Sequence, residues 1–238
     1  MRFNIHAGHN PDGMTACGAV ALIKESTEAR KVKDKLIEIL KSAGHTVYDC
    51  TCNNGKNQND VLKKIVAKCN EHNVDLDISI HFNAGANDEK GNGRTTGVEA
   101  FVYDIKTSAW GYADKICKAI SSLGLKNRGV KINQGLYVLN STKAPALLIE
   151  CCFVDDKDDI SLYSAEKMAE AIAEGLGVKI DKEDAEVVEP SKIIVDGKEV
   201  AVKRILKDGT NYIAIRDIAE AVGYSVGNKG NIAVLEKK

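Results

Sequence analysis

The sequence predicts an α/β fold, in which a central, mostly parallel twisted sheet is flanked by helices on both faces, followed by a small β-rich α+β domain. Three observations favour this fold class. Strand-like and helix-like segments alternate from residue 3 to residue 82. The apolar run at 145–149 lacks the polar alternation of a half-exposed strand, which indicates a strand buried on both faces. Two Asp-Gly pairs near the C-terminus mark hairpin turns.

The composition is that of an ordinary soluble globular protein. The chain has 238 residues, of which 44% are hydrophobic and 28% charged, enough for one sizeable domain and a small second one. With 33 basic and 34 acidic side chains, no overall field attracts nucleic acid or anionic lipid. No apolar run approaches the ~20 residues of a membrane span. We therefore expect neither nucleic-acid binding nor membrane insertion.

Apolar spacing assigns the elements of the first domain. Apolar residues recur every three or four positions in the helices and fall in short runs in the strands. The helix that opens at Glu25 is stopped by Gly44, because glycine readily ends a helix. The expected strands cover 3–9, 46–49, 76–82, 97–103, 136–139 and 145–149, and the expected helices cover 25–43, 62–69, 110–120 and 164–176.

The chain is expected to contain two domains, at 1–178 and 192–238, joined by an acidic linker at 179–191. Residues 179–189 hold two lysines against five acidic residues, and Pro190 follows, which is typical of a solvated linker. In the second domain Asp196-Gly197 predicts a hairpin, and Asp208-Gly209 repeats that signal. A strand at 212–214, a helix at 215–222 and a last strand at 232–234 complete this small module.

The seven cysteines are an odd number and lack the paired spacing of a thiolate zinc site. Their only close pairs are Cys50-Thr51-Cys52 and the adjacent Cys151 and Cys152. We expect reduced, mostly buried thiols that pack as small hydrophobic groups, not a disulfide framework.

Glu150 ends the apolar run Leu147-Leu148-Ile149, and a carboxylate in that position is costly unless it has a partner or a chemical role. His9 and His81 each close a strand-like stretch, and Glu25 opens a helix. Two imidazoles and one carboxylate form a catalytic type of zinc site with a position left for water, and Glu150 would be its general base. Spacing alone leaves open that these histidines are structural, because no His-Glu-x-x-His signature is present.

Four separated motifs occur in order along the first domain: AGHN, KESTEARKVKDKLIEILKSAG, DISIHFNA and RGVKINQGLYVLNSTKAPALLIECCFVDDKDD. Together they resemble the zinc-dependent N-acetylmuramoyl-L-alanine amidases that hydrolyse bacterial cell walls. The resemblance implies that His9, Glu25 and His81 bind Zn²⁺ and that Glu150 is the catalytic glutamate. The chain departs from the family pattern at Cys151-Cys152, where an aliphatic residue and a glycine are usual.

Two residues compete for the metal in this interpretation. Glu28 lies one turn beyond Glu25, but counting back from Gly44 places Glu25 at the family's ligand position. His6 precedes His9 by three residues and is interpreted as structural.

Asn83 follows His81 and is a candidate substrate contact, although asparagine is also common in turns. The polar loop at 85–94 either lines the substrate groove or is a solvated connection.

The resemblance implies hydrolysis of the amide between N-acetylmuramic acid and the L-alanine of the peptidoglycan stem peptide. The first residues, Met1-Arg2-Phe3-Asn4-Ile5-His6, do not form the apolar core that a signal peptide needs, so we expect none. We therefore expect synthesis in the host cytoplasm and action at the cell wall after holin-mediated release, as for a phage endolysin. The alternatives are a bacterial autolysin or spore-wall amidase, a zinc carboxypeptidase that trims stem peptides, and a catalytically silent wall-binding protein. Oligomeric state is not addressed by the sequence.

The C-terminal segment IIVDGKEVAVKRILKDGTNYIAIRDIAEAVGYSV resembles small domains related to the N-terminal domain of copper amine oxidases. Residues 192–238 contain no His, Cys or Met, so the resemblance brings no copper ligands. It implies a module that holds the enzyme on the bacterial wall, and the alternative is an appendage that only adds stability.

Overall fold

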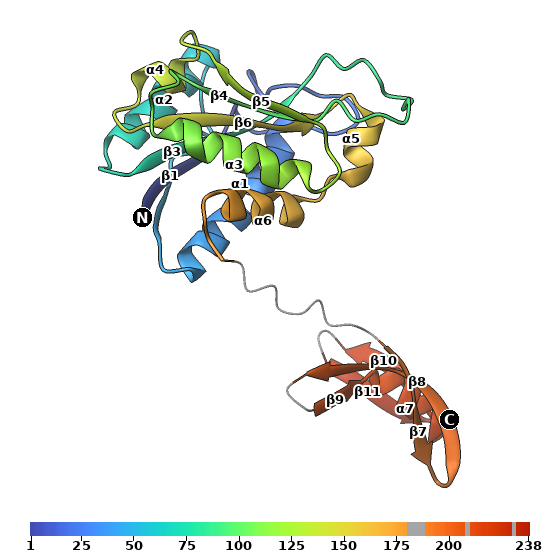
Figure 1. Cartoon of the computed structure of the whole chain (residues 1–238). Helices are drawn as coiled ribbons and strands as arrows, with labels where there is room; N and C mark the ends of the chain where they lie inside the picture. Colours follow the sequence, from blue (N-terminus) through green and yellow to red (C-terminus); the bar gives the residue numbers. More distant parts are fainter. Residues whose placement is uncertain (180–188, 208–209, 230–231) are drawn as a thin grey trace. The chain divides into compact units, whose positions relative to one another are not determined.

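The computed structural model describes residues 1–179, 189–207, 210–229 and 232–238. The chain divides into two compact units, Met1–Ile180 and Asp181–Lys238 (Figure 1). Among the described residues, no helix combines the length and the apolar character needed to cross a membrane.

Unit 1 is built on a six-stranded sheet in the order β2-β1-β3-β6-β4-β5. All neighbouring strands run parallel except β4 and β6, which are antiparallel. This confirms the predicted fold class. The strands are β1 (Arg2–Ala7), β2 (Thr46–Asp49), β3 (Leu76–Asn83), β4 (Val98–Val102), β5 (Asn127–Ile132) and β6 (Ala146–Phe153).

Helices cover both faces of this sheet. One face carries α1 (Glu25–Ser42), α3 (Ala109–Ser121) and α6 (Ala165–Gly175), and the other carries α2 (Gln58–Asn70) and α4 (Tyr137–Ser141) (Figure 1). Neighbouring residues of β6 pack on opposite faces of the sheet. Leu147 belongs to the larger apolar cluster, with residues of α1, α3 and α6, and Leu148 belongs to the smaller one, with residues of α2 and α4. The predicted burial of this strand on two faces is therefore confirmed.

The buried face of α1 and the N-terminus of α2 follow from local sequence. On α1, Ala29, Val32, Leu36 and Leu40 are all fully buried, as their spacing of three and four residues predicts. The side chain of Asn57 caps α2 by accepting from the backbone N–H of Asp60.

The prediction of a strand at 136–139 was wrong, because residues 137–141 form helix α4. Val138 and Leu139 are buried against the smaller apolar cluster, and Thr142 Oγ1 donates to the carbonyl of Val138. An apolar run this short suits a strand or a single helical turn equally well, so tertiary packing decides it. Strand β5 and helix α5 (Lys157–Leu162) were not predicted.

Unit 2 contains a three-stranded antiparallel sheet and a two-stranded one. The predicted hairpin at Asp196-Gly197 is confirmed, because both residues have positive φ, 48° and 78°, between paired strands β7 and β8. Asp208-Gly209 and residues 180–188 of the expected linker lie outside the described residues. Strand β10 was not predicted. The elements are β7 (Glu189–Val195), β8 (Lys198–Lys207), β9 (Thr210–Ile213), α7 (Ile215–Ala221), β10 (Tyr224–Lys229) and β11 (Ile232–Lys237).

Candidate metal centre and active site

His9, Glu25 and His81 come together at one end of the parallel strands. One ligand atom from each residue lies within 4.8 Å of the others. Glu25 Oε1 is 2.9 Å from His81 Nδ1 and 3.2 Å from His9 Nε2. His9 follows β1 by two residues, Glu25 opens α1, and His81 lies in β3 near its end. Three elements far apart in sequence thus supply one cluster.

Backbone donors fix the Glu25 carboxylate. Its Oε2 accepts from the N–H of Ala19 at 2.8 Å, and its Oε1 accepts from the N–H of Phe82 at 3.3 Å. Burial by itself would raise the pKa of Glu25, but hydrogen bonds from His81 and His9 outweigh burial and hold that pKa well below its usual range. Glu25 therefore stays ionised, as a metal ligand must.

Two glycines allow the close approach of these side chains. A Cβ atom on Gly8 would lie 2.0 Å from His81 Cε1, and a Cβ atom on Gly18 would lie 2.4 Å from Glu25 Oε2. His9 itself adopts a φ of 64°, which is uncommon for a residue with a side chain. Its carbonyl accepts from Arg30 Nη2 at 3.0 Å, which holds this strained loop in place.

The donor set and its unpaired atoms fit a divalent metal ion. Two imidazoles and one carboxylate match the ligands of catalytic zinc, and they leave a coordination position for water or substrate. His9 Nδ1 is buried and has no hydrogen-bond partner among the described residues. Buried polar atoms are nearly always paired. An unpaired imidazole nitrogen therefore fits a site where a metal ion either binds this nitrogen or sets the orientation of the ring.

Glu150 lies beside this cluster on β6, directly paired with His81 of β3. Burial, followed by the charges of Glu25 and Glu99, raises the pKa of Glu150 to about 8. Its Oε2 is a buried oxygen for which the described part of the chain offers no partner. Such a carboxyl group is suited to accept a proton and release it again near neutral pH.

The rival residues are engaged elsewhere. Glu28 accepts from the hydroxyl of Tyr163 at 2.9 Å and pairs with Lys31, away from the cluster. His6 is almost fully buried, with Nδ1 3.4 Å from Ser79 Oγ, and burial lowers its pKa to about 3. His6 is therefore a neutral core residue.

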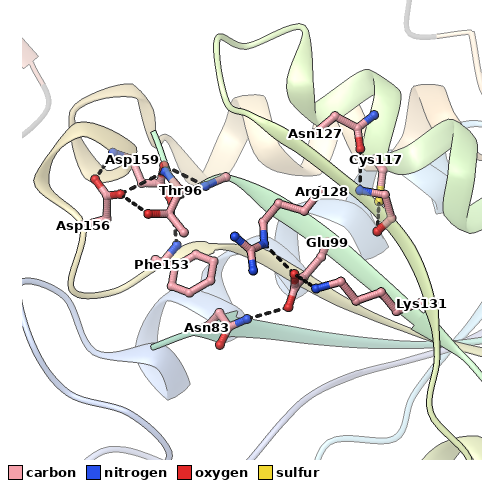
Figure 2. Close-up of polar contacts among 12 residues, drawn as sticks. Asn83, Thr96, Glu99, Cys117, Asn127, Arg128, Lys131, Phe153, Asp156 and Asp159 are labelled. Carbon is pink, nitrogen blue, oxygen red and sulfur yellow. Dashed lines mark hydrogen bonds and ion pairs between the residues drawn. The ribbon is translucent and has the colours of Figure 1, made fainter. Parts of the chain in front are cut away.

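Asn83 contacts the carboxylate of Glu99, which was not predicted as a site residue. Its Nδ2 donates to Glu99 Oε1 at 2.9 Å (Figure 2), and its Oδ1 accepts from the N–H of Ala84. Glu99 is only 4% exposed and also binds Arg128 and Lys131. The signal was available, since Glu99 interrupts the apolar strand Val98–Val102 just as Glu150 interrupts its own.

Carboxylates of the segment after β6 hold the loop at 85–94. Asp155 accepts from the backbone N–H groups of Gly85, Ala86 and Asn87, and Asp158 accepts from those of residues 92–94. Asp156 likewise accepts from the backbone N–H of Thr96 (Figure 2), and Asp159 accepts from that of Gly97. The loop is thus tied down through its backbone amides.

Residues 4–182 match the N-acetylmuramoyl-L-alanine amidase family. The chain belongs to this family. An uncharacterised protein of Clostridium perfringens is 33% identical to this amidase-family chain over 222 residues, covering 92% of this chain and 61% of the relative. That match is longer than unit 1 and extends into unit 2.

Two further relatives carry functional names. The endolysin of Bacillus phage SPP1 is 31% identical over 182 residues, which cover 72% of this chain and 61% of the endolysin. The catalytic domain of CD27L, an endolysin targeting Clostridia difficile, is 30% identical with a TM-score of 0.67, covering 76% of this chain and 99% of that domain. The amidase-family chain spans 53–61% of the length of the first curated relatives that it matches.

Proposed function

We propose that this protein is a zinc-dependent N-acetylmuramoyl-L-alanine amidase that hydrolyses peptidoglycan. The observation that carries the proposal is the convergence of His9, Glu25 and His81 beside Glu150, a partly buried carboxyl group with a raised pKa, in a chain of this family. The two imidazoles and the carboxylate of Glu25 would hold the ion, and Glu150 would carry the proton.

Each side chain has a definite task in the proposed reaction. Zinc, when bound, supplies a Lewis acid that lowers the pKa of water and polarises the amide carbonyl. Glu150 accepts a proton from the attacking water and delivers it to the departing amine of L-alanine. Gly8 and Gly18 leave room for His81 and Glu25, so the ligands are held in place before substrate arrives.

We also propose the role of a phage endolysin, with residues 1–178 as the catalytic domain, 179–191 as a linker and 192–238 as a wall-binding domain. The names of the relatives from phage SPP1 and of CD27L support the endolysin role. Unit 2 presents apolar side chains to solvent, among them Ile194 and Tyr212, which are 76% and 55% exposed. A bacterial autolysin would use the same chemistry.

The proposal is tested with purified peptidoglycan and the full chain. Dialysis against a chelator should abolish release of stem peptides, and added zinc should restore it. An amidase frees peptides with N-terminal alanine and leaves the glycan strands intact, whereas a carboxypeptidase trims the other end of the peptide. Turnover by metal-free protein would eliminate the zinc mechanism, and product lacking N-terminal alanine would eliminate the amidase.

A further inference from the structure

Glu99 belongs to the same row of side chains as the proposed catalytic groups. It is directly paired with Glu150 across the antiparallel strands β4 and β6, and Glu150 is paired with His81 across β6 and β3. Adjacent strands lie about 4.8 Å apart, so the three residues follow one another across the sheet. The side chains that contact Glu99 therefore lie close to the proposed catalytic groups, His81 and Glu150.

Two cations surround this single carboxylate. Arg128 Nε and Lys131 Nζ each lie 2.5 Å from Glu99 Oε2, and Asn83 donates to Oε1 (Figure 2). One negative charge thus faces two positive charges, which leaves the cluster with a net charge of +1. Burial alone would raise the pKa of Glu99, but Arg128 and Lys131 lower it, so the carboxylate is ionised.

A β-bulge places both cations on the same side. The β4–β5 register moves from Val98↔Asn127 to Ala100↔Val130, so β5 contains one extra residue at this point. Gly129 has a φ of 76°, and its N–H donates to Asn127 Oδ1. Residues three apart on a regular strand point to opposite faces, and the extra residue brings Arg128 and Lys131 to the same carboxylate.

Arg128 keeps hydrogen-bond donors available. It uses Nε for Glu99, and within the described residues neither of its Nη atoms has a hydrogen-bond acceptor. Its guanidinium carbon lies 5.0 Å from the ring centroid of Phe153, which is 5% exposed and forms a fixed platform. The side chains of Arg128 and Lys131 are 30% and 43% exposed, so a ligand can reach them.

We propose that Arg128 and Lys131 bind a carboxylate of the stem peptide next to the amide that is cleaved, with Glu99 and Asn83 as positioning residues. The inference rests on the proposed amidase function. A planar guanidinium fork suits a carboxylate, and the cluster needs one negative charge for neutrality. The carboxyl group of the muramic acid is consumed in the scissile amide, so a nearby negative charge must come from the peptide.

The test uses two synthetic muramoyl peptides that differ only in whether the residue after L-alanine bears a carboxylate or a carboxamide. Zinc-loaded wild type should favour the carboxylate in kcat/KM by about tenfold or more, because hydrogen bonds between charged groups are the stronger ones. Arg128→Gln should remove that preference mainly through KM, and Arg128→Lys should restore part of it. Lys118→Gln, at an exposed lysine of α3 that pairs with Asp114 and not with Glu99, is the matched control and should keep the preference.

Equilibrium binding of the two alanyl peptides, without the sugar, separates this inference from the amidase proposal. If wild type cleaves neither muramoyl peptide but binds the carboxylate peptide through Arg128, the amidase function fails and the subsite stands. The subsite would be overturned if Arg128→Gln lowered kcat/KM equally for both substrates, or if it left the preference for the carboxylate unchanged. If Arg128→Gln does not fold, the double variant Glu99→Gln/Arg128→Gln avoids a buried unpaired charge and carries the same expectation.

Discussion

Glu150 on β6 and His81 on β3 are directly paired residues of adjacent parallel strands. Strand pairing fixes their spacing by backbone hydrogen bonds, so the proposed base and one proposed ligand stand on a rigid part of the sheet. The third strand of the row adds Glu99, whose charge contributes to the raised pKa of Glu150. This arrangement leads to specific expectations for activity, metal binding and stability.

Replacing Glu150 by Gln keeps its volume but removes the proton acceptor. We expect turnover to fall by roughly 10²–10⁴-fold, as loss of a general base does, with zinc content nearly unchanged. Stem-peptide release and metal analysis check both parts, and Glu174→Gln, an exposed carboxylate of α6, is the control. Normal turnover in the Glu150 variant would make this residue structural.

Acidification should weaken zinc binding. The pKa of Glu25 is held low, so its carboxylate remains ionised, and protons then compete with zinc for the imidazole nitrogens of His9 and His81. Competition with a chromophoric chelator from pH 7.5 to pH 5 should show affinity falling steadily. Affinity that is insensitive to pH would argue against histidine ligation.

Gly8→Ala should disrupt the metal site, because the new Cβ would lie within 2.0–2.6 Å of three atoms of the His81 ring. We expect lower zinc affinity together with destabilisation of about 1–3 kcal/mol from overpacking. Gly111→Ala in α3 is the matched control, since its Cβ would meet nothing within 4 Å and alanine favours helix. Unchanged zinc affinity in Gly8→Ala would show that the site tolerates movement of His81.

Asp77→Asn should stabilise the protein at neutral pH. Burial raises the pKa of Asp77 from 3.8 to about 6, so the folded state favours the protonated form. That contribution is fully present below pH 3.8 and is lost as pH rises through about 6. The variant should gain on the order of 2–3 kcal/mol at pH 7.5 and nothing near pH 3.5.

Urea denaturation across this pH range measures the gain for Asp77→Asn, and Glu71→Gln is the exposed control. A gain that is independent of pH would assign the stabilisation to packing of the amide and not to loss of the buried charge.

Asp155→Ala should loosen the loop at 85–94. Three backbone N–H groups lose a charged acceptor, each such bond contributing about 1.5–3 kcal/mol. Hydrogen exchange should accelerate at Gly85, Ala86 and Asn87, while the amides bound by Asp158 change less. Uniform acceleration over 85–94 would mean that the loop opens as one unit.

The sequence predicted most of unit 1 because its long helices and buried strands carry strong periodic patterns. It failed at 136–139, where four apolar residues fit either element, and at β5, whose sequence Asn-Arg-Gly-Val-Lys-Ile is half polar and bulged. A bulge depends on the neighbouring strand and leaves only a weak trace in the sequence.

The candidate site was predicted unevenly. Resemblance led to His9, Glu25, His81 and Glu150, and the structure brings them together. The cluster around Glu99 was missed, because its members lie on three strands and no single motif contains them. The positive φ of His9 and the contact between Gly8 and His81 also depend on three-dimensional packing.

The seven cysteines are all free, and six of them are buried, including Cys151 and Cys152 beside Glu150. Burial raises the pKa of both of these thiols, which suppresses the reactive thiolate. All seven lie before residue 153, so thiol-specific labelling reports on unit 1 alone. An alkylating reagent should therefore modify the partly exposed Cys17 rapidly and the six buried cysteines only when unit 1 unfolds. The labelling rate of these six thiols would then measure the unfolding rate of unit 1.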